Sequence, residues 1–103
     1  MRKITNDSVN AFMNSQKFNQ SNMQVEVLPN VTILKYHGNS IAYKYNDPKS
    51  TIAVTNCGWE STTTKERLNG VLHKAGKSYR IKQKDFVWYL DGKEWDGKLI
   101  DIN

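Results

Sequence analysis

Turn dipeptides between short apolar segments constrain this chain more than any other feature. Pro29-Asn30, Gly38-Asn39 and Asp47-Pro48 separate segments rich in β-branched and aromatic residues. Connections this short join antiparallel strands, because a parallel pair needs a crossover of about a dozen residues or more. The sequence therefore predicts a meander of four antiparallel strands over residues 24–56.

Alternation inside these segments predicts how their side chains are oriented. Val25 and Val27 lie two residues apart, as do Ile41, Tyr43 and Tyr45. Successive side chains of a strand point to opposite faces of a sheet. Each of these two sets is therefore expected on a single face.

A helix is predicted before the meander. Thr5 or Asp7 can serve as its N-cap, because a short oxygen-bearing side chain accepts a bond from a free amide at a helix start. Val9, Phe12 and Met13 follow at the i, i+3, i+4 spacing of an apolar helix face.

A second helix is predicted to begin near Thr63, since Thr63-x-x-Glu66 has the spacing of a capping box. Gly76 is the expected stop. Gly70 lies inside and costs about 1 kcal/mol relative to alanine, so this helix must depend on tertiary packing. Its expected buried stripe is Leu68, Val71 and Leu72.

Further strand signals follow the second helix. They cover residues 78–84 and 85–90, and Asp91-Gly92 and Asp96-Gly97 are hairpin signals that lead into residues 93–95 and 98–102. The predicted order is helix, four strands, helix, three strands, which is an α+β fold with an antiparallel sheet of short strands. The 103 residues are expected to form a single domain, 1–103.

Positive charge is concentrated in one passage of the chain. Residues 61–84 carry seven cations and one acid, a net of +6, whereas the remainder carries eight cations and nine acids. Residues 85–103 are acidic, with a net of −3. This asymmetry predicts one basic side, which bears on partners rather than on the fold.

The basic passage suggests a surface for a phosphate backbone. In an extended strand over residues 78–84, Arg80, Lys82 and Lys84 share a face at a spacing of about 6.6 Å. The preceding helix can widen this row, and Tyr79 can add base stacking of about 1 to 3 kcal/mol. The candidate nucleic-acid-binding residues are Lys65, Arg67, Lys74, Lys77, Tyr79, Arg80, Lys82 and Lys84. A competing interpretation is an edge strand that lysines protect from aggregation.

Three threonines open the second helix. Thr62, Thr63 and Thr64 lie where free backbone N–H groups and the helix dipole favour an anion. They are the candidate anion site, which a polyanion or a small anionic nucleotide can occupy.

Catalysis and metal binding have little support in the sequence. The nucleophile candidate Cys57 has no sequence spacing that places it beside His37 or His73. No zinc-type ligand spacing or glycine-rich phosphate loop occurs. A non-enzymatic protein without catalytic residues, metal or cofactor is expected.

The compartment is expected to be intracellular. No apolar run approaches the roughly 20 residues that span a bilayer, and residues 1–12 lack the apolar core of a signal peptide. A single cysteine fits a reducing cytosol. No membrane association is expected.

Three segments together resemble a group of small bacteriophage accessory proteins made during infection. HGNSIA (37–42), GWESTTTKERLN (58–69) and YLDGKEWDG (89–97) are similar to that group's HGN-x-IA, GW…TTKERLN and LNG-x-x-WDG motifs. The resemblance extends from about Asn22 onward. A more distant similarity is to the phage T4 factor that neutralises a host endoribonuclease toxin and to which RNA binding is attributed. It implies a role in the host cytoplasm.

The leading hypothesis is therefore a phage protein that binds RNA, more than DNA, and counters a host defence or host nuclease. One alternative is a protein inhibitor whose basic face docks on an acidic host protein, and another is sequestration of a small anionic nucleotide. Residues 86–90 are apolar on both faces, so they form either a central strand or a homodimer surface. The nucleic-acid hypothesis requires Arg67, Lys74, Arg80, Lys82 and Lys84 to share one open patch.

Overall fold

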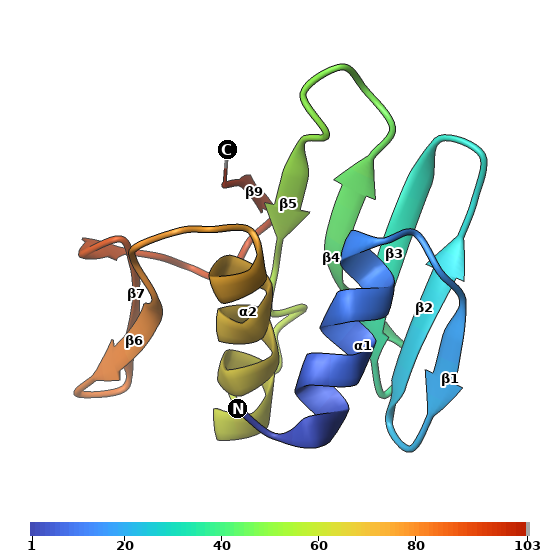
Figure 1. The fold of residues 1–103 in the computed structure, drawn as a ribbon. Helices are drawn as coiled ribbons and strands as arrows, with labels where there is room; N and C mark the ends of the chain where they lie inside the picture. Colours follow the sequence, from blue (N-terminus) through green and yellow to red (C-terminus); the bar gives the residue numbers. More distant parts are fainter. Residues whose placement is uncertain (103) are drawn as a thin grey trace.

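Two helices cover one face of a six-stranded antiparallel sheet, and a three-stranded sheet packs beside the second helix (Figure 1). This is the arrangement in a computed structural model that describes residues 1–102. The elements are α1 (Lys3–Met13), β1 (Phe18–Gln20), β2 (Met23–Val27), β3 (Val31–Tyr36), β4 (Asn39–Tyr45), β5 (Ile52–Val54), α2 (Thr62–Lys74), β6 (Ile81–Lys84), β7 (Val87–Leu90), β8 (Lys93–Glu94) and β9 (Ile100–Asp101). The predicted α+β class is confirmed.

The larger sheet has the order β1-β2-β3-β4-β5-β9. Its central strands β2 to β5 are the expected meander, with every neighbouring pair antiparallel. The strands that follow α2 divide between two sheets, because Gly97 does not return the chain to β8. Its carbonyl accepts bonds from the Asn56 amide (3.0 Å) and the Thr55 hydroxyl (2.7 Å), which direct the chain to β9 beside β5.

A bulge in β4 changes which side chains face the helices. The β3–β4 register shifts between Leu34 and Lys35, so Ile41 has no partner on β3. Ile41 is fully buried, whereas the rings of Tyr43 and Tyr45 stack 6.2 Å apart on the opposite face. The prediction that these three residues share a face is wrong, because a bulge adds one residue and reverses the alternation.

Three hairpin turns have residues with positive φ at both central positions, and two of them carry glycine at the second position. His37 (φ 50°) and Gly38 (φ 78°) connect β3 to β4, so the turn lies one residue earlier than the predicted Gly38-Asn39. Asp91 (φ 53°) and Gly92 (φ 76°) form the second turn as expected. Such turns match the twist of the paired strands.

The helix α1 begins without a side-chain cap. Its N-cap is Arg2, so the prediction of Thr5 or Asp7 as the cap is wrong. Thr5 lies inside the helix and is fully buried against α2. Val9 and Phe12 are fully buried, as the apolar spacing predicts.

The helix α2 begins earlier than the sequence suggests. Ser61 is the N-cap, and its hydroxyl accepts a hydrogen bond from the Thr64 amide at 3.1 Å. The predicted capping box of Thr63 and Glu66 is therefore wrong. Glu66 instead contacts Arg67 and Thr5.

The C-terminal end of α2 is as predicted. Gly76 has φ 77°, the Lys77 amide donates to the Leu72 carbonyl (3.0 Å), and the Gly76 amide donates to the His73 carbonyl (3.1 Å). This pair of bonds is a Schellman motif, which a glycine enters without steric cost. The predicted stripe of Leu68, Val71 and Leu72 is fully buried.

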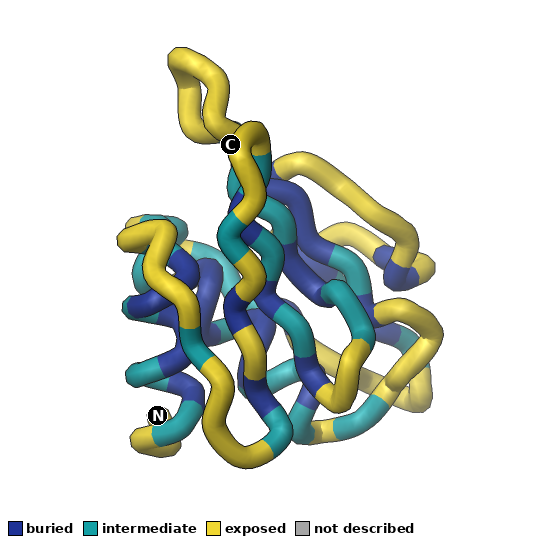
Figure 2. The backbone as a smooth tube through the Cα atoms, turned by 90° about the vertical axis from the view of Figure 1, so that its right-hand side faces the viewer, coloured by how far each residue is buried: buried dark blue, intermediate teal, exposed yellow. Residues whose placement is uncertain are grey.

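The core fills the space between the two helices and the larger sheet. Figure 2 shows the buried segments where these layers face each other, with exposed turns around them. The fully buried side chains there include Val9, Phe12, Met23, Leu34, Ile41, Val54, Leu68, Val71 and Leu72. The core therefore fixes α1 and α2 side by side.

The two helices pack closely at Gly70. A methyl group at position 70 would lie 2.6 Å from Thr5 Cγ2 and 3.4 Å from Val9 Cγ2. The first distance is a clash with a buried side chain. The close packing of the two helices here explains why a glycine, with its cost in helix propensity, occupies position 70.

We predict that Gly70→Ala changes the sign of its effect when Thr5 is shortened. In the unsubstituted background, Gly70→Ala should either leave the free energy of unfolding unchanged or lower it by up to about 2 kcal/mol, because overpacking offsets the gain in helix propensity. In a Thr5→Ser background, which lacks Cγ2 but keeps the hydroxyl, it should stabilise by about 1 kcal/mol. Urea unfolding of all four proteins measures this, and equal effects in both backgrounds would contradict a tight crossing.

Candidate nucleic-acid interface

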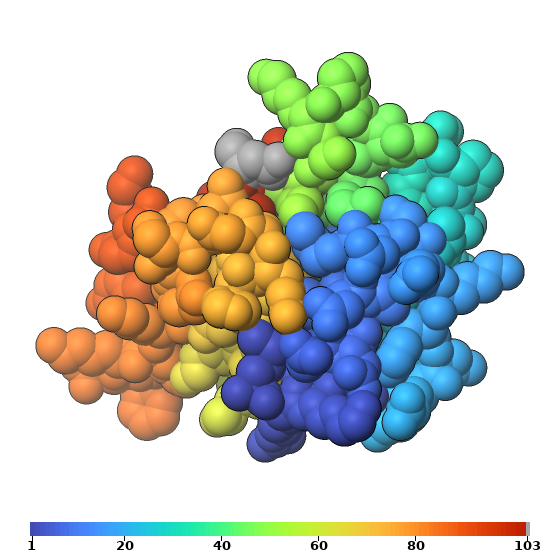
Figure 3. Space-filling view, viewed as in Figure 1, coloured from blue at the N-terminus to red at the C-terminus, as the bar shows by residue number. Residues whose placement is uncertain are grey.

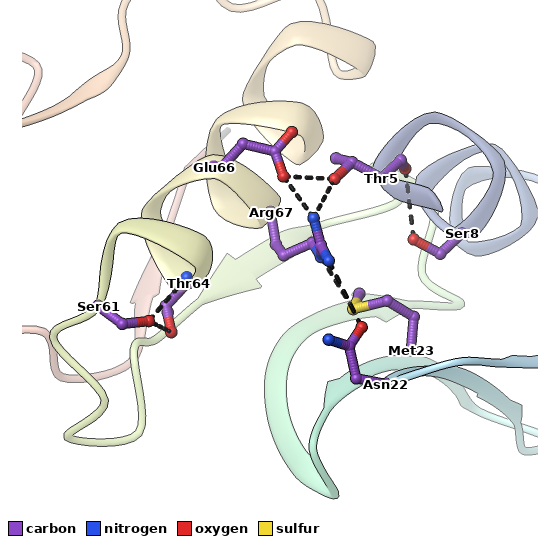
Figure 4. A network of polar contacts seen from close by, with 8 residues as sticks. All are labelled: Thr5, Ser8, Asn22, Met23, Ser61, Thr64, Glu66 and Arg67. Atoms are coloured by element: carbon purple, nitrogen blue, oxygen red, sulfur yellow. Dashed lines mark hydrogen bonds and ion pairs between the residues drawn. The ribbon is translucent and has the colours of Figure 1, made fainter. Parts of the chain in front are cut away.

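Arg67 does not reach the surface, contrary to the prediction for this candidate contact. Its side chain is only 2% exposed, and Nη1 donates to Glu66 Oε1 and to Thr5 Oγ1 (2.6 Å) (Figure 4). Nε lies 3.3 Å from the sulfur of Met23, and Nη2 lies 3.4 Å from Asn22 Oδ1. Arg67 therefore links α2 to α1 and to the start of β2.

The position of Arg67 on the helix explains its burial. Arg67 precedes Leu68 and lies four residues before Val71, so it belongs to the buried side of α2. The Tyr36 ring lies 5.7 Å from the guanidinium carbon and adds a cation–π contact. A buried cation requires such compensation, because desolvating an unpaired charge is very costly.

A groove along the outer side of α2 is the best-formed feature near the basic passage. We call it the α2 groove; it has a volume of about 500 Å³ and is lined by Met1, Thr62, Lys65, Glu66, Asn69, Gly70, His73 and Arg80. The helical residues recur every three or four positions, so they share one face. Figure 3 shows this strip recessed between the N-terminal residues and the residues around β6.

Two cations in the α2 groove have neutral partners. Lys65 Nζ donates to Gln83 Oε1 (3.1 Å) and lies 5.9 Å from the centre of the Trp88 ring. Arg80 Nη1 donates to the carbonyls of Lys77 (2.7 Å) and Tyr79 (2.8 Å). These contacts orient the cations without neutralising them.

His73 completes the cationic end of the groove. Arg80 Nη2 lies 3.1 Å from His73 Nδ1, which accepts this bond when the ring is neutral and protonated on Nε2. Glu66 lines the same groove, but one of its oxygens is paired with Arg67. Among residues 1–102, Lys65 and Arg80 make no ion pair with a carboxylate; the pairs are Lys3–Asp7, Lys35–Glu26, Arg67–Glu66 and Lys98–Asp96.

Asn69 attaches the three-stranded sheet to α2. Its side-chain amide donates to the Ile81 carbonyl (3.0 Å) and accepts from the Ile81 amide (2.7 Å). Because the order of this sheet is β6-β7-β8, these bonds occupy the free edge of β6. The basic strand is thus an edge strand that a helix side chain covers in part.

The predicted row of Arg80, Lys82 and Lys84 does not form. β6 begins at Ile81, and Arg80 turns back toward α2. Lys82 and Lys84 are exposed and point away from α2, because Ile81 and Gln83 occupy the face toward it. The single open patch of Arg67, Lys74, Arg80, Lys82 and Lys84 that the sequence predicts therefore does not form. Arg67 is buried, and only Arg80 of these five lines the α2 groove.

Tyr79 and Lys77 lie outside the α2 groove. The Tyr79 hydroxyl donates to the Ile102 carbonyl (3.1 Å), and burial together with nearby Asp91 raises the pKa of Tyr79. Tyr79 is thus a packing residue. Lys77 lines a separate hollow of about 340 Å³ with Lys44, beyond the last turn of α2. Lys74, the last residue of α2, is half-buried.

The three threonines differ in accessibility. Thr64 is fully buried, its hydroxyl bonds with the hydroxyl of Ser61 (2.9 Å), and its amide is capped. Thr63 is half-buried, and exposed Thr62 lines the α2 groove. The cap leaves fewer free amides at this helix end for the predicted anion.

Cys57 is not arranged as an activated nucleophile. The residue is exposed, but its sulfur is partly shielded and donates to the Ser40 carbonyl (2.9 Å). Burial raises the pKa of the thiol, against a smaller opposing effect of the Thr55 hydroxyl. Within residues 1–102, no group of three His, Cys, Asp or Glu side chains could hold a metal ion. Across the same residues, no helix is long and apolar enough to cross a membrane.

A protein-family model described as "Kyanoviridae Gp96 protein" matches residues 1–100. The chain belongs to the Kyanoviridae Gp96 family. Because this is a family of phage proteins, the expected bacteriophage origin is confirmed. Neither the curated proteins nor the solved structures include a match to this Gp96 family member.

Asn69 and His73 are among the α2 groove residues of this Gp96 family member that sequence reasoning missed. Asn69 and His73 follow Lys65 at intervals of four, so helical periodicity alone places all three on one face. The bonds from Asn69 to Ile81 and from His73 to Arg80 depend on tertiary structure. No local pattern predicts them.

We predict that Arg67 acts in folding and not as a surface contact. Arg67→Ala should lower the free energy of unfolding by about 3 to 5 kcal/mol, because it removes the cation that pairs with Glu66 and leaves that carboxylate with only the Thr5 hydroxyl as a donor. Arg67→Lys should recover only part of this, since an ammonium lacks the planar fork. The matched surface change Lys74→Ala should alter stability by less than about 0.5 kcal/mol. Equal urea midpoints for Arg67→Ala and Lys74→Ala would contradict this role.

The raised pKa of Cys57 predicts slow, pH-dependent alkylation. At about pH 7.5 the thiol should react with iodoacetamide more slowly than a free cysteine, whose pKa is about 8.5, because less thiolate is present. The rate should still be rising above about pH 9. Mass spectrometry over a pH series, with glutathione as the control, measures this. A plateau below about pH 7.5 would instead indicate an activated thiol.

Proposed function

We propose that this Gp96 family protein binds single-stranded RNA through the α2 groove without catalysing a reaction. The proposal is supported by the convergence of Lys65 and Arg80 on one open groove, where their partners are neutral. A phosphate backbone can supply the missing negative charge, and the release of its counterions drives binding of this kind.

The length of the α2 groove favours a polymer. Its helical lining runs from Thr62 to His73, which corresponds to roughly 16 Å at 1.5 Å per residue. This exceeds the size of one phosphate group. Lys77 lies outside this groove, in the separate hollow beyond the end of α2.

A small anionic nucleotide is the second candidate ligand. The volume of about 500 Å³ lies within the range of about 300 to 1,000 Å³ for small-molecule pockets. Calorimetry with cyclic nucleotides and with an RNA oligonucleotide separates the two candidates. Tighter binding of the free nucleotide would support sequestration instead of RNA binding.

We further propose that RNA binding counters a host nuclease inside the infected cell. The similarity to the T4 factor that neutralises an endoribonuclease toxin motivates this role. A protein that covers a single strand can protect it without cleaving it. The competing role, docking on an acidic host protein, predicts a stoichiometric partner that survives nuclease treatment of the lysate.

Affinity for a single-stranded RNA oligonucleotide should fall steeply with salt. With about five phosphate contacts, raising salt from about 50 to about 200 mM should weaken binding roughly 100-fold. The double variant Lys65→Gln, Arg80→Gln should weaken binding and reduce the slope of log K against log salt by about 1.4.

The matched control removes the same charge elsewhere on the surface. Lys17→Gln, Lys98→Gln lies outside the α2 groove and should keep most of the affinity and the original slope. Absence of binding at about 50 mM salt would overturn the proposal. Equal losses in the two double variants would show that net charge, and not the groove, drives binding.

A further inference from the structure

The tip of the β6–β7 hairpin carries an aromatic residue where glycine is expected. Asp85 (φ 53°) and Phe86 (φ 67°) are its two turn residues, and the Phe86 side chain is 90% exposed. Positive φ at both positions favours Asn-Gly or Asp-Gly, because a Cβ atom disfavours this conformation. A bulky residue with positive φ is a strained exception.

The other hairpin turns show what the chain uses when only geometry matters. Gly38 and Gly92 occupy the same second turn position as Phe86, with φ 78° and φ 76°. Phe86 gains no compensating burial, since its ring projects into solvent. Neither the backbone conformation nor packing therefore accounts for phenylalanine at position 86.

Two lysines near the tip lie on the face of the hairpin that points away from α2. The register places Lys84 opposite Val87 and Lys82 opposite Tyr89, so these four side chains share that face. Both lysines are exposed, and within residues 1–102 neither makes an ion pair. The acids nearby are Asp85 at the tip and Glu94 of β8, which lies opposite Tyr89 of β7.

We infer that Phe86 stacks on an unpaired nucleobase while Lys82 and Lys84 hold the adjoining phosphates. This inference rests on the proposed RNA binding and assigns its base contact. A single exposed ring flanked by cations fits a base joined to phosphates, since stacking accepts any base. Protein docking instead uses a broader apolar patch, whereas Val87 beside the tip is half-buried.

The α2 groove and the hairpin tip are close enough to serve one strand. Lys65 in the groove donates to Gln83, which lies three residues before Phe86 on the same strand and turn. A strand leaving the groove at Lys65 passes the edge of β6 and meets the tip. The groove thereby positions the backbone, and the tip contacts a base.

The test compares variants that separate the ring from the turn. Phe86→Gly should bind a single-stranded RNA oligonucleotide at least about 5-fold more weakly, the lower end of the measured stacking contribution. Its melting temperature should be unchanged or higher, because glycine adopts positive φ freely. Phe86→Asn, which also tolerates positive φ, should lose the same affinity, and Phe86→Trp should keep it.

Asp85→Gly is the matched control, because it relaxes the same turn and keeps the ring. It should bind at least as tightly as the unsubstituted protein, because it keeps the ring and removes a negative charge at the tip. A 2-aminopurine base in the oligonucleotide reports stacking directly: its fluorescence should be quenched by the unsubstituted protein and by Asp85→Gly, but not by Phe86→Gly.

Each result bears on a different step. No binding of single-stranded RNA by the unsubstituted protein overturns the proposed function itself. If Phe86→Gly binds single-stranded RNA as tightly as the unsubstituted protein, the stacking inference alone is overturned. The same follows if Phe86→Gly weakens binding of duplex RNA equally, since a paired base is not accessible for stacking. Equal losses for single-stranded RNA and DNA support stacking on an unpaired base of either polymer. If Phe86→Gly still binds RNA but no longer captures a host protein that the unsubstituted protein captures from nuclease-treated lysate, Phe86 makes a protein contact and the stacking inference is overturned.

Discussion

The buried Arg67 guanidinium is the interaction on which the rest of the structure depends. It joins Glu66 of its own helix to Thr5 of α1 and approaches Asn22 and Met23 at the start of β2. A desolvated cation is tolerated only where its partners are held in place. The network therefore requires α1, α2 and the sheet to adopt one relative arrangement, which the close crossing at Gly70 also demands.

This internal network also shapes the surface charge. The basic passage contains seven cations and one acid, and the buried Arg67 pairs with that acid, Glu66, at the margin of the groove. Six cations are left around α2 and β6 without a carboxylate of the same passage. The positive character of the α2 groove is thus a consequence of how the core is assembled.

The three-stranded sheet packs against the same core beside α2. Its inner face packs Ile81, Trp88 and Leu90, and Asn69 binds its edge to α2. The turn at Phe86 lies at the far end of this hairpin. A rigid frame that presents an exposed loop is the usual arrangement for recognition, and here the loop adjoins the groove.

The sequence by itself determined the features that depend on neighbouring residues. Turn dipeptides, strand alternation and helical periodicity produced the meander, the stripe of α2 and its end at Gly76, because each follows from local backbone geometry. Tertiary structure alone decided the burial of Arg67, the bulge at Ile41, the pairing of β9 with β5 and the turn of Arg80 toward His73. The physical reason is that these depend on partners distant in the chain, so no short segment contains the groups that stabilise them.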